Sequence, residues 1–136
     1  MEVHQVADES AMKALGAQLG HRLSVGDVVL LRGELGAGKT TLVRGLLEGL
    51  GHVGAVRSPT FNLVQSFETS PPVMHADLYR VGSYLGIGLE DYLDTHLSLI
   101  EWPDRAEGLI DPASAWRVEI DFTEIGRSVK ISPPGT

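Results

Sequence analysis

The residues of this chain best suited to chemistry follow a glycine-rich stretch. Residues 30–45 read LLRGELGAGKTTLVRG and match the spacing G-x-x-x-x-G-K-[ST], with Gly33, Gly38, Lys39 and Thr40 in the fixed positions. In a phosphate-binding loop of this spacing, backbone N–H groups surround phosphate oxygens and the lysine ammonium neutralises their charge. The stretch therefore predicts a loop that holds the phosphates of a nucleotide.

Each residue of this loop has an expected role. Gly36 and Gly38 let backbone N–H groups turn inward, because no Cβ is in the way. Lys39 should reach the β- and γ-phosphate oxygens, and the Thr40 hydroxyl should occupy one Mg²⁺ position. Thr41 is placed to hydrogen-bond the α-phosphate. A dinucleotide-binding loop fits less well, since G-x-G-x-x-G would need glycine where Thr41 stands.

Two carboxylates end predicted strands and are candidates for the metal. The hydrophobic runs VMHAD and LSLIE close on Asp77 and Glu101 respectively. Ligands of α/β proteins bind at the carboxyl ends of strands, and nucleotide chemistry needs acidic groups to hold a hydrated metal and to orient water. Each residue taken singly is as well explained by a solvated strand end, or by an ion pair with Arg80 or Arg105. Together with the glycine loop, both are expected to be site residues.

Three further residues are weaker candidates. Thr60, in the segment Ser58-Pro59-Thr60-Phe61, lies where a switch segment would sense the γ-phosphate or the metal, although a simple turn explains it about as well. Trp102 follows Glu101 and could form a wall of the site. His75 shares a strand face with Asp77 and is expected to be a core histidine, because the five scattered histidines form no metal cluster.

The elements that must position these residues follow from periodicity and turn signals. We expect, in order: an edge strand at 2–6; a helix from Asp8, as N-cap, to about Leu23; a buried strand at 28–32; a helix after the loop, stopped by Gly51; a hairpin of 61–68 and 73–77; a short helix within 86–94; a strand at 97–101; a helix opening at Pro103; and a hairpin of strands near 115–121 and 127–131. This order predicts an α/β fold, a P-loop NTPase-like three-layer sandwich whose central mixed β-sheet is flanked by helices, as a single domain over residues 1–136.

Composition narrows the class of partner. The chain has 11 basic and 18 acidic residues and a net charge of −7, with no basic run. Binding to a nucleic-acid backbone needs clustered Lys and Arg, so direct binding of DNA or RNA is not expected. Cysteine is absent, and neither a membrane span nor a secretory signal is recognisable. A cytoplasmic protein without a membrane partner is expected.

The motifs leave three classes of nucleotide protein in competition. A GTPase is excluded, because the guanine-reading N-K-x-D motif needs an asparagine and the only one is Asn62, which does not begin that motif. A small-metabolite kinase remains possible, although the chain has little room for a substrate lid. A switch-like ATPase acting on a protein partner suits a compact acidic domain better. A nucleotide sensor that never hydrolyses its ligand also remains open.

Several segments together resemble one family. GELGAGKTTLVRG, VRSPTFNLV, HADLYR, GLEDYL and LIEWPDRAEGL, at these intervals, are similar to the bacterial TsaE (YjeE) family, the ATPase component of the machinery that makes threonylcarbamoyladenosine in tRNA. The resemblance covers about Asp8 to Ser132. One departure is Glu34, where the family usually has aspartate.

The resemblance implies a role for each matching residue. It implies ATP and Mg²⁺ as ligands, Thr40 and Glu101 as Mg²⁺ ligands, and Asp77 as a carboxylate needed for ATPase function; whether Asp77 binds the metal directly, through water, or positions the attacking water stays open. Thr60 falls in the family's switch-like segment, and Trp102 beside its nucleotide. The phosphate-binding loop matches Gly36, Ala37, Gly38, Lys39, Thr40 and Thr41, and the adenine contact is expected around Glu9 or Ser10.

The resemblance also implies partners. Family members bind a TsaB–TsaD pair in which TsaD performs the carbamoyl transfer, while ATP binding favours assembly and hydrolysis resets the complex. Transfer RNA would then be contacted mainly by the partners, which agrees with the acidic charge of this chain. A weak ATPase with a conformational output is the resulting expectation.

Overall fold

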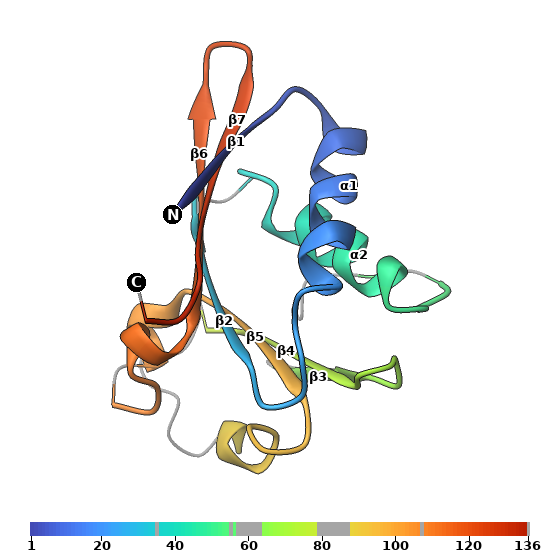
Figure 1. The fold of residues 1–136 in the computed structure, drawn as a ribbon, viewed down its shortest axis with the longest axis vertical. Coiled ribbons are helices and arrows are strands. Elements are labelled where there is room, and N and C mark those ends of the chain that lie inside the picture. The colour runs from blue at the N-terminus through green and yellow to red at the C-terminus, as the bar shows by residue number, and fades with distance from the viewer. Residues whose placement is uncertain (35, 55, 57–63, 79–87, 107, 136) are drawn as a thin grey trace.

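The chain forms a seven-stranded mixed β-sheet in the order β1-β7-β6-β2-β5-β4-β3, with two helices on one face (Figure 1). The computed structural model describes residues 1–34, 36–54, 56, 64–78, 88–106 and 108–135. The helices are α1 (Glu9–Gly20) and α2 (Lys39–Gly49). The strands are β1 (Glu2–Val6), β2 (Val28–Gly33), β3 (Val64–Phe67), β4 (Val73–Asp77), β5 (Leu97–Glu101), β6 (Trp116–Thr123) and β7 (Gly126–Ser132).

The centre of the sheet is parallel, and this positions the loop and the carboxylates at one edge. Strand β2 pairs in parallel with both β5 and β6, and β5 pairs in parallel with β4. The run Val28–Leu31 is buried at every position, as expected for a strand covered on both faces. Because parallel strands end at the same edge, the carboxyl ends of β2, β4 and β5 meet there.

Two apolar clusters cover the two faces of the sheet. One lies between the sheet and the helices, with Leu19, Leu46 and Leu99 among its buried members. The other lies on the opposite face and includes Leu30 and Ile100. Three short 3₁₀ helices, Leu89–Asp91, Pro103–Ala106 and Pro112–Ser114, follow β4 and β5, and residues beside them close this second cluster. The expected α/β fold with a central mixed sheet is confirmed.

Helices α1 and α2 pack in close contact because glycines face each other's backbones. A Cβ added at Gly16 would lie 2.2 Å from Leu42 O, and one at Gly45 would lie 2.1 Å from Lys13 O. The predicted N-cap of α1 is confirmed, since the Asp8 carboxylate accepts from Ala11 N–H at 2.8 Å.

Most of the predicted elements are confirmed, and the main differences concern one helix end and two segments that were expected to be helices. The helix α1 ends at Gly20 rather than near Leu23, although Leu23 remains buried as its periodicity predicted. The segments expected to be helical within 86–94 and from Pro103 are 3₁₀ turns over their described residues. Such short segments gain too few hydrogen bonds to extend as α-helices. None of the helices in the described ranges is long and apolar enough to cross a membrane.

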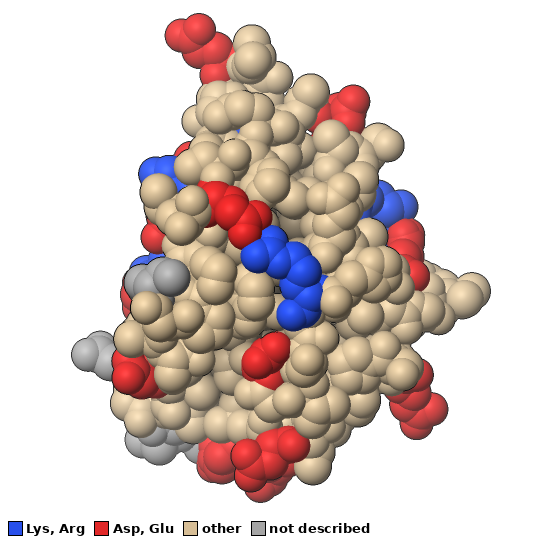
Figure 2. Space-filling model, viewed as in Figure 1, with Lys and Arg blue, Asp and Glu red and all other residues tan. Residues whose placement is uncertain are grey.

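Charged side chains do not form a continuous basic surface on the face drawn in Figure 2. On this face acidic side chains lie at many separate places, and the basic side chains are few, with one small central group bordered by acidic residues. This distribution agrees with the net charge of −7. The drawn face therefore lacks the clustered positive charge that a nucleic-acid backbone requires.

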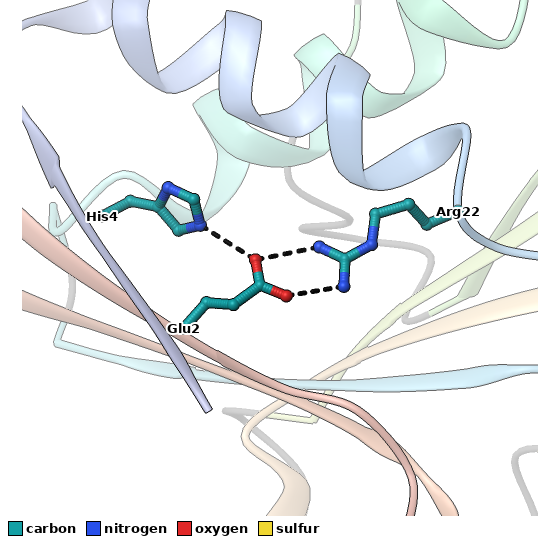
Figure 3. A network of polar contacts seen from close by, with 3 residues as sticks. All are labelled: Glu2, His4 and Arg22. Carbon is teal, nitrogen blue, oxygen red and sulfur yellow. Dashed lines mark hydrogen bonds and ion pairs between the residues drawn. The ribbon is translucent and has the colours of Figure 1, made fainter.

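An ion pair fastens the edge strand β1 to the chain just after α1 (Figure 3). The Arg22 guanidinium donates to both carboxylate oxygens of Glu2, at 3.0 and 2.6 Å, and His4 Nε2 lies 3.1 Å from Oε1. Hydrogen bonding by Arg22, and then by His4, lowers the pKa of Glu2 to about 2. The contact joins a strand at the margin of the sheet to the helix layer.

The helix contact generates a test of the fold. We expect Gly45→Ala to lower the free energy of unfolding by about 1–3 kcal/mol, because the new methyl group meets backbone that cannot move aside. Urea unfolding followed by circular dichroism measures the change. Gly20→Ala is the matched control with a smaller expected loss, since its Cβ would meet the Leu46 side chain at 3.2 Å and Leu46 O at 3.3 Å, which small shifts relieve. Equal stability of Gly45→Ala and the unchanged protein would contradict the close helix contact.

Candidate functional site

The glycine loop between β2 and α2 needs glycine for its backbone shape. Gly36 and Gly38 have φ angles of +82° and +116°, in the left-handed region, and Gly38 is the N-cap of α2. A Cβ at Gly38 would also lie 3.0 Å from the Met12 side chain on α1. Ala37 N–H donates to Glu34 O at 3.0 Å, which tightens the turn. The loop thus enters α2 with the positive end of the helix dipole at the site.

Lys39 is buried at the start of α2, with 6% of its surface exposed. Its Nζ donates to Gly33 O at 2.6 Å, lies 3.9 Å from Glu101 Oε1, and sits over the Trp102 ring, 4.2 Å from the centroid. Burial lowers the pKa of Lys39 below its ordinary value, although the negative charges of Glu101 and Asp77 oppose that change. The site therefore holds a poorly hydrated ammonium with donors available for an anion.

The two predicted carboxylates lie side by side. Asp77 and Glu101 are register partners on the parallel strands β4 and β5. Glu101 is 2% exposed, and its Oε2 lies 2.5 Å from Nε2 of fully buried His75. Because an ionised carboxylate only accepts, His75 donates through Nε2, and this leaves Oε1 turned toward Lys39.

His75 is buried as predicted, but its contact with Glu101 was missed. The two residues lie diagonally on neighbouring strands, since His75 pairs in register with Leu99. The available signal was the alternation of β4, which puts His75 on the same face as Asp77. Sequence alone did not show that β5 is the neighbour of β4.

Most of the predicted site residues line one cavity of about 230 Å³, called here the Lys39 cavity. Its lining brings together the loop, the start of α2 and the ends of β4 and β5. The lining residues are Gly36, Gly38, Lys39, Thr40, Thr41, Asp77, Glu101 and Trp102. Thr60 and Arg80 lie outside the described residues.

The oxygen donors of this cavity fit a magnesium ion that is bound together with phosphate. Mg²⁺ takes one or two carboxylates and completes its shell with waters and phosphate oxygens. Thr40, Asp77 and Glu101 supply a hydroxyl and two carboxylates. Among the described residues, no group of three or more His, Cys, Asp or Glu could hold a metal by themselves. A metal here would therefore depend on oxygens of the bound ligand.

A second cavity of about 320 Å³, the Arg127 cavity, adjoins the first and shares Gly36, Gly38 and Thr41 with it. Glu9, one of the two residues expected near an adenine, lines it, and Ser10 is not among its lining residues. The lining residues are Val6, Ala7, Asp8, Glu9, Met12, Gly36, Ala37, Gly38, Thr41, Gly126 and Arg127. No sequence pattern indicated that Met12 or Arg127 would lie at this site, because their positions depend on tertiary contacts.

The strand, glycine loop and helix, set in a mixed sheet, define a P-loop-like α/β protein. The model of the family Threonylcarbamoyl adenosine biosynthesis protein TsaE matches residues 6–129, and the chain belongs to this family. The family takes part in the biosynthesis of threonylcarbamoyladenosine in tRNA. The resemblance seen in the sequence is thereby confirmed.

Individual relatives agree with this assignment. The tRNA threonylcarbamoyladenosine biosynthesis protein TsaE of Streptomyces coelicolor is 44% identical over 117 residues, which cover 80% of this chain and 76% of the relative. The protein of the same description from Haemophilus influenzae is 39% identical over 109 residues, covering 76% and 68%. The crystal structure of Bacillus subtilis YdiB superposes with a TM-score of 0.84 at 28% identity, covering 98% of this chain and 86% of that one.

The buried ammonium generates a test of stability. Because the pKa of Lys39 is lower in the fold than in the unfolded chain, the folded state disfavours the proton, and charged Lys39 costs stability below that pKa. We expect the free energy of unfolding of the unchanged protein to rise, relative to that of Lys39→Met, as the pH rises from 7 toward 10. This relative rise should end only above pH 10.5, the ordinary pKa of lysine, where Lys39 is neutral in both the folded and the unfolded state.

Urea titrations of both proteins at pH 7 and pH 10 measure this dependence. Lys13→Met is the matched control, because Lys13 is partly exposed and pairs with Glu48 on the neighbouring helix. A gap between Lys39→Met and the unchanged protein that did not vary with pH would contradict a charge-based cost.

Proposed function

We propose that the chain is a weak Mg²⁺-dependent ATPase that serves as a nucleotide switch in threonylcarbamoyladenosine biosynthesis. The observation that carries this proposal is the meeting of Lys39, Thr40, Asp77 and Glu101 in one cavity at the N-terminus of α2. A buried cation, a hydroxyl and two carboxylates beside a glycine loop are the set that phosphoryl chemistry uses.

In this proposal the loop and Lys39 bind the phosphates. The ammonium exchanges its hydrogen bond with Gly33 O for one with a phosphate oxygen, and its low hydration makes this exchange inexpensive. Backbone N–H groups at the start of α2 donate to the same phosphates. Trp102 covers the ammonium with its ring and limits access of water to it.

The carboxylates act on the metal and the attacking water. Thr40 and Glu101 would hold Mg²⁺, with Asp77 either as a further ligand or as the group that positions water. The ion would neutralise charge on the phosphate oxygens. His75 keeps Glu101 oriented by occupying Oε2, which leaves Oε1 for the site.

The Arg127 cavity suits the nucleoside. It adjoins the Lys39 cavity across Gly36, Gly38 and Thr41, so a ligand with its phosphates at Lys39 has its sugar and base there. Glu9 and Met12 supply one carboxylate and one apolar side chain. Adenine is the base we propose, on the strength of the family resemblance.

The output of the switch is proposed to be assembly with a TsaB–TsaD pair, in which TsaD carries out the transfer. Family membership supports a place in the same biosynthesis. The net charge of −7 supports contact with tRNA through those partners rather than through this chain.

The carboxylates give a direct test. We expect Glu101→Gln and Asp77→Asn each to lower the rate of ATP hydrolysis roughly 10²–10³-fold, because each removes one charge placed for the metal or the water. Glutamine keeps an acceptor for His75, so the fold should persist. Asp104→Asn is the control, since this exposed carboxylate near Glu101 pairs with Arg32. Phosphate release, measured with and without TsaB and TsaD, gives the rate.

The same assay separates the alternatives. Hydrolysis that is stimulated by TsaB and TsaD, with stronger capture of the pair in ATP than in ADP, supports the switch. Phosphoryl transfer to a small metabolite without partners would instead identify a kinase. Nucleotide-dependent capture with no turnover would identify a sensor, and normal turnover by Glu101→Gln would refute the metal assignment.

A further inference from the structure

A guanidinium that lies far from the glycine loop in sequence is bonded to the loop's backbone. Arg127, at the second position of β7, donates from Nε to Ala37 O at 3.1 Å and from Nη2 to Gly36 O at 3.5 Å. It also lines the cavity beside the loop. Two consecutive carbonyl groups of the loop therefore point at one side chain.

These hydrogen bonds determine which way the loop's N–H groups face. In a planar trans peptide the C=O and N–H point in opposite directions. When Ala37 O is held by Arg127, the N–H of Gly38 is turned away from Arg127. The peptides of this stretch are flanked by glycines with positive φ, for which rotation meets little steric resistance. Without a partner for the carbonyl, the Ala37–Gly38 peptide would be free to turn over.

Arg127 is itself held in place before any ligand binds. Its Nη1 donates to Gly126 O at 3.0 Å, and its Cζ lies 4.3 Å from the centroid of the Phe122 ring. Gly126 has φ of +152°, and a Cβ there would lie 2.3 Å from Val6 O, so β7 begins in direct contact with the end of β1. The Arg127 guanidinium is thus held in place on the β6–β7 hairpin, which extends beyond the other strands (Figure 1).

We propose that Arg127 is a positioning residue that holds the Ala37–Gly38 peptide with its N–H toward the phosphates. The proposal rests on the proposed function, since it assumes that this loop binds phosphate. Three of the five N–H donors of Arg127 go to backbone carbonyl groups, two of them in the loop, so we assign its effect to the loop rather than to direct contact with phosphate. A planar fork suits two adjacent carbonyls, whereas a lysine provides a single point charge.

The test compares Arg127→Met and Arg127→Lys with Arg22→Met. Arg22 is a matched control because it also lies over an aromatic ring, that of Trp116 at 5.0 Å, but it contacts Glu2 and lines neither cavity. Calorimetry measures the dissociation constants of MgATP and of magnesium tripolyphosphate, which has no base. Thermal unfolding verifies that each variant is folded.

We expect the substitution of Arg127 to weaken binding of the phosphate part of the ligand. Arg127→Met should raise the dissociation constants of MgATP and of magnesium tripolyphosphate by the same factor, about 10- to 100-fold. This is the scale expected when hydrogen bonds to a charged group are lost. Arg127→Lys should recover only a small part of this loss. Arg22→Met should lower the unfolding temperature and leave both dissociation constants unchanged.

Other outcomes overturn the proposal in distinguishable ways. Weaker binding of MgATP alone would show that Arg127 contacts the base or the sugar. Full recovery by Arg127→Lys would show that positive charge alone is needed. Equally weakened binding in Arg22→Met would show that the effect comes from a general loss of stability. Absence of binding by the unchanged protein would refute the proposed function itself, and the role of Arg127 with it.

Discussion

The buried ammonium of Lys39 is the interaction on which the rest of this structure depends. Removing a cation from water is costly, and surrounding polar groups can offset part of that cost. Gly33 O, the Glu101 carboxylate and the Trp102 ring do so here, and they come from the ends of β2 and β5 and the residue after β5. The parallel pairing of β2 with β5 is thus a requirement of the site as well as of the core.

The same requirement explains the close packing around the loop. The loop is contacted from three sides: by Met12 on α1, by the Lys39 side chain within, and by Arg127 on β7. Glycine at position 38 permits the close approach of Met12, because a Cβ there would lie 3.0 Å from that side chain, and it also permits the positive φ of the turn. A flexible glycine stretch thereby becomes a surface of defined shape, which is what binding of a highly charged ligand requires.

The buried site and the exterior of the molecule differ in charge. One ammonium, that of Lys39, is buried at the start of α2, while the chain as a whole is acidic. An acidic exterior opposes direct contact with RNA. Membership of the TsaE family places the chain in a biosynthesis whose product is a modified tRNA, so this distribution of charge agrees with the role through other proteins that we propose.

The sequence by itself determined the glycine loop, the strands that end in Asp77 and Glu101, the N-cap at Asp8 and the α/β class, because each depends on spacing within a short segment. Only the tertiary structure decided that His75 bonds Glu101, that Arg127 bonds a loop 90 positions earlier, and that Glu9 rather than Ser10 lines the second cavity. These contacts depend on the order of strands in the sheet and on the angle at which α1 crosses α2. Many arrangements of the same strands satisfy the local patterns, and burial of the whole core selects one of them.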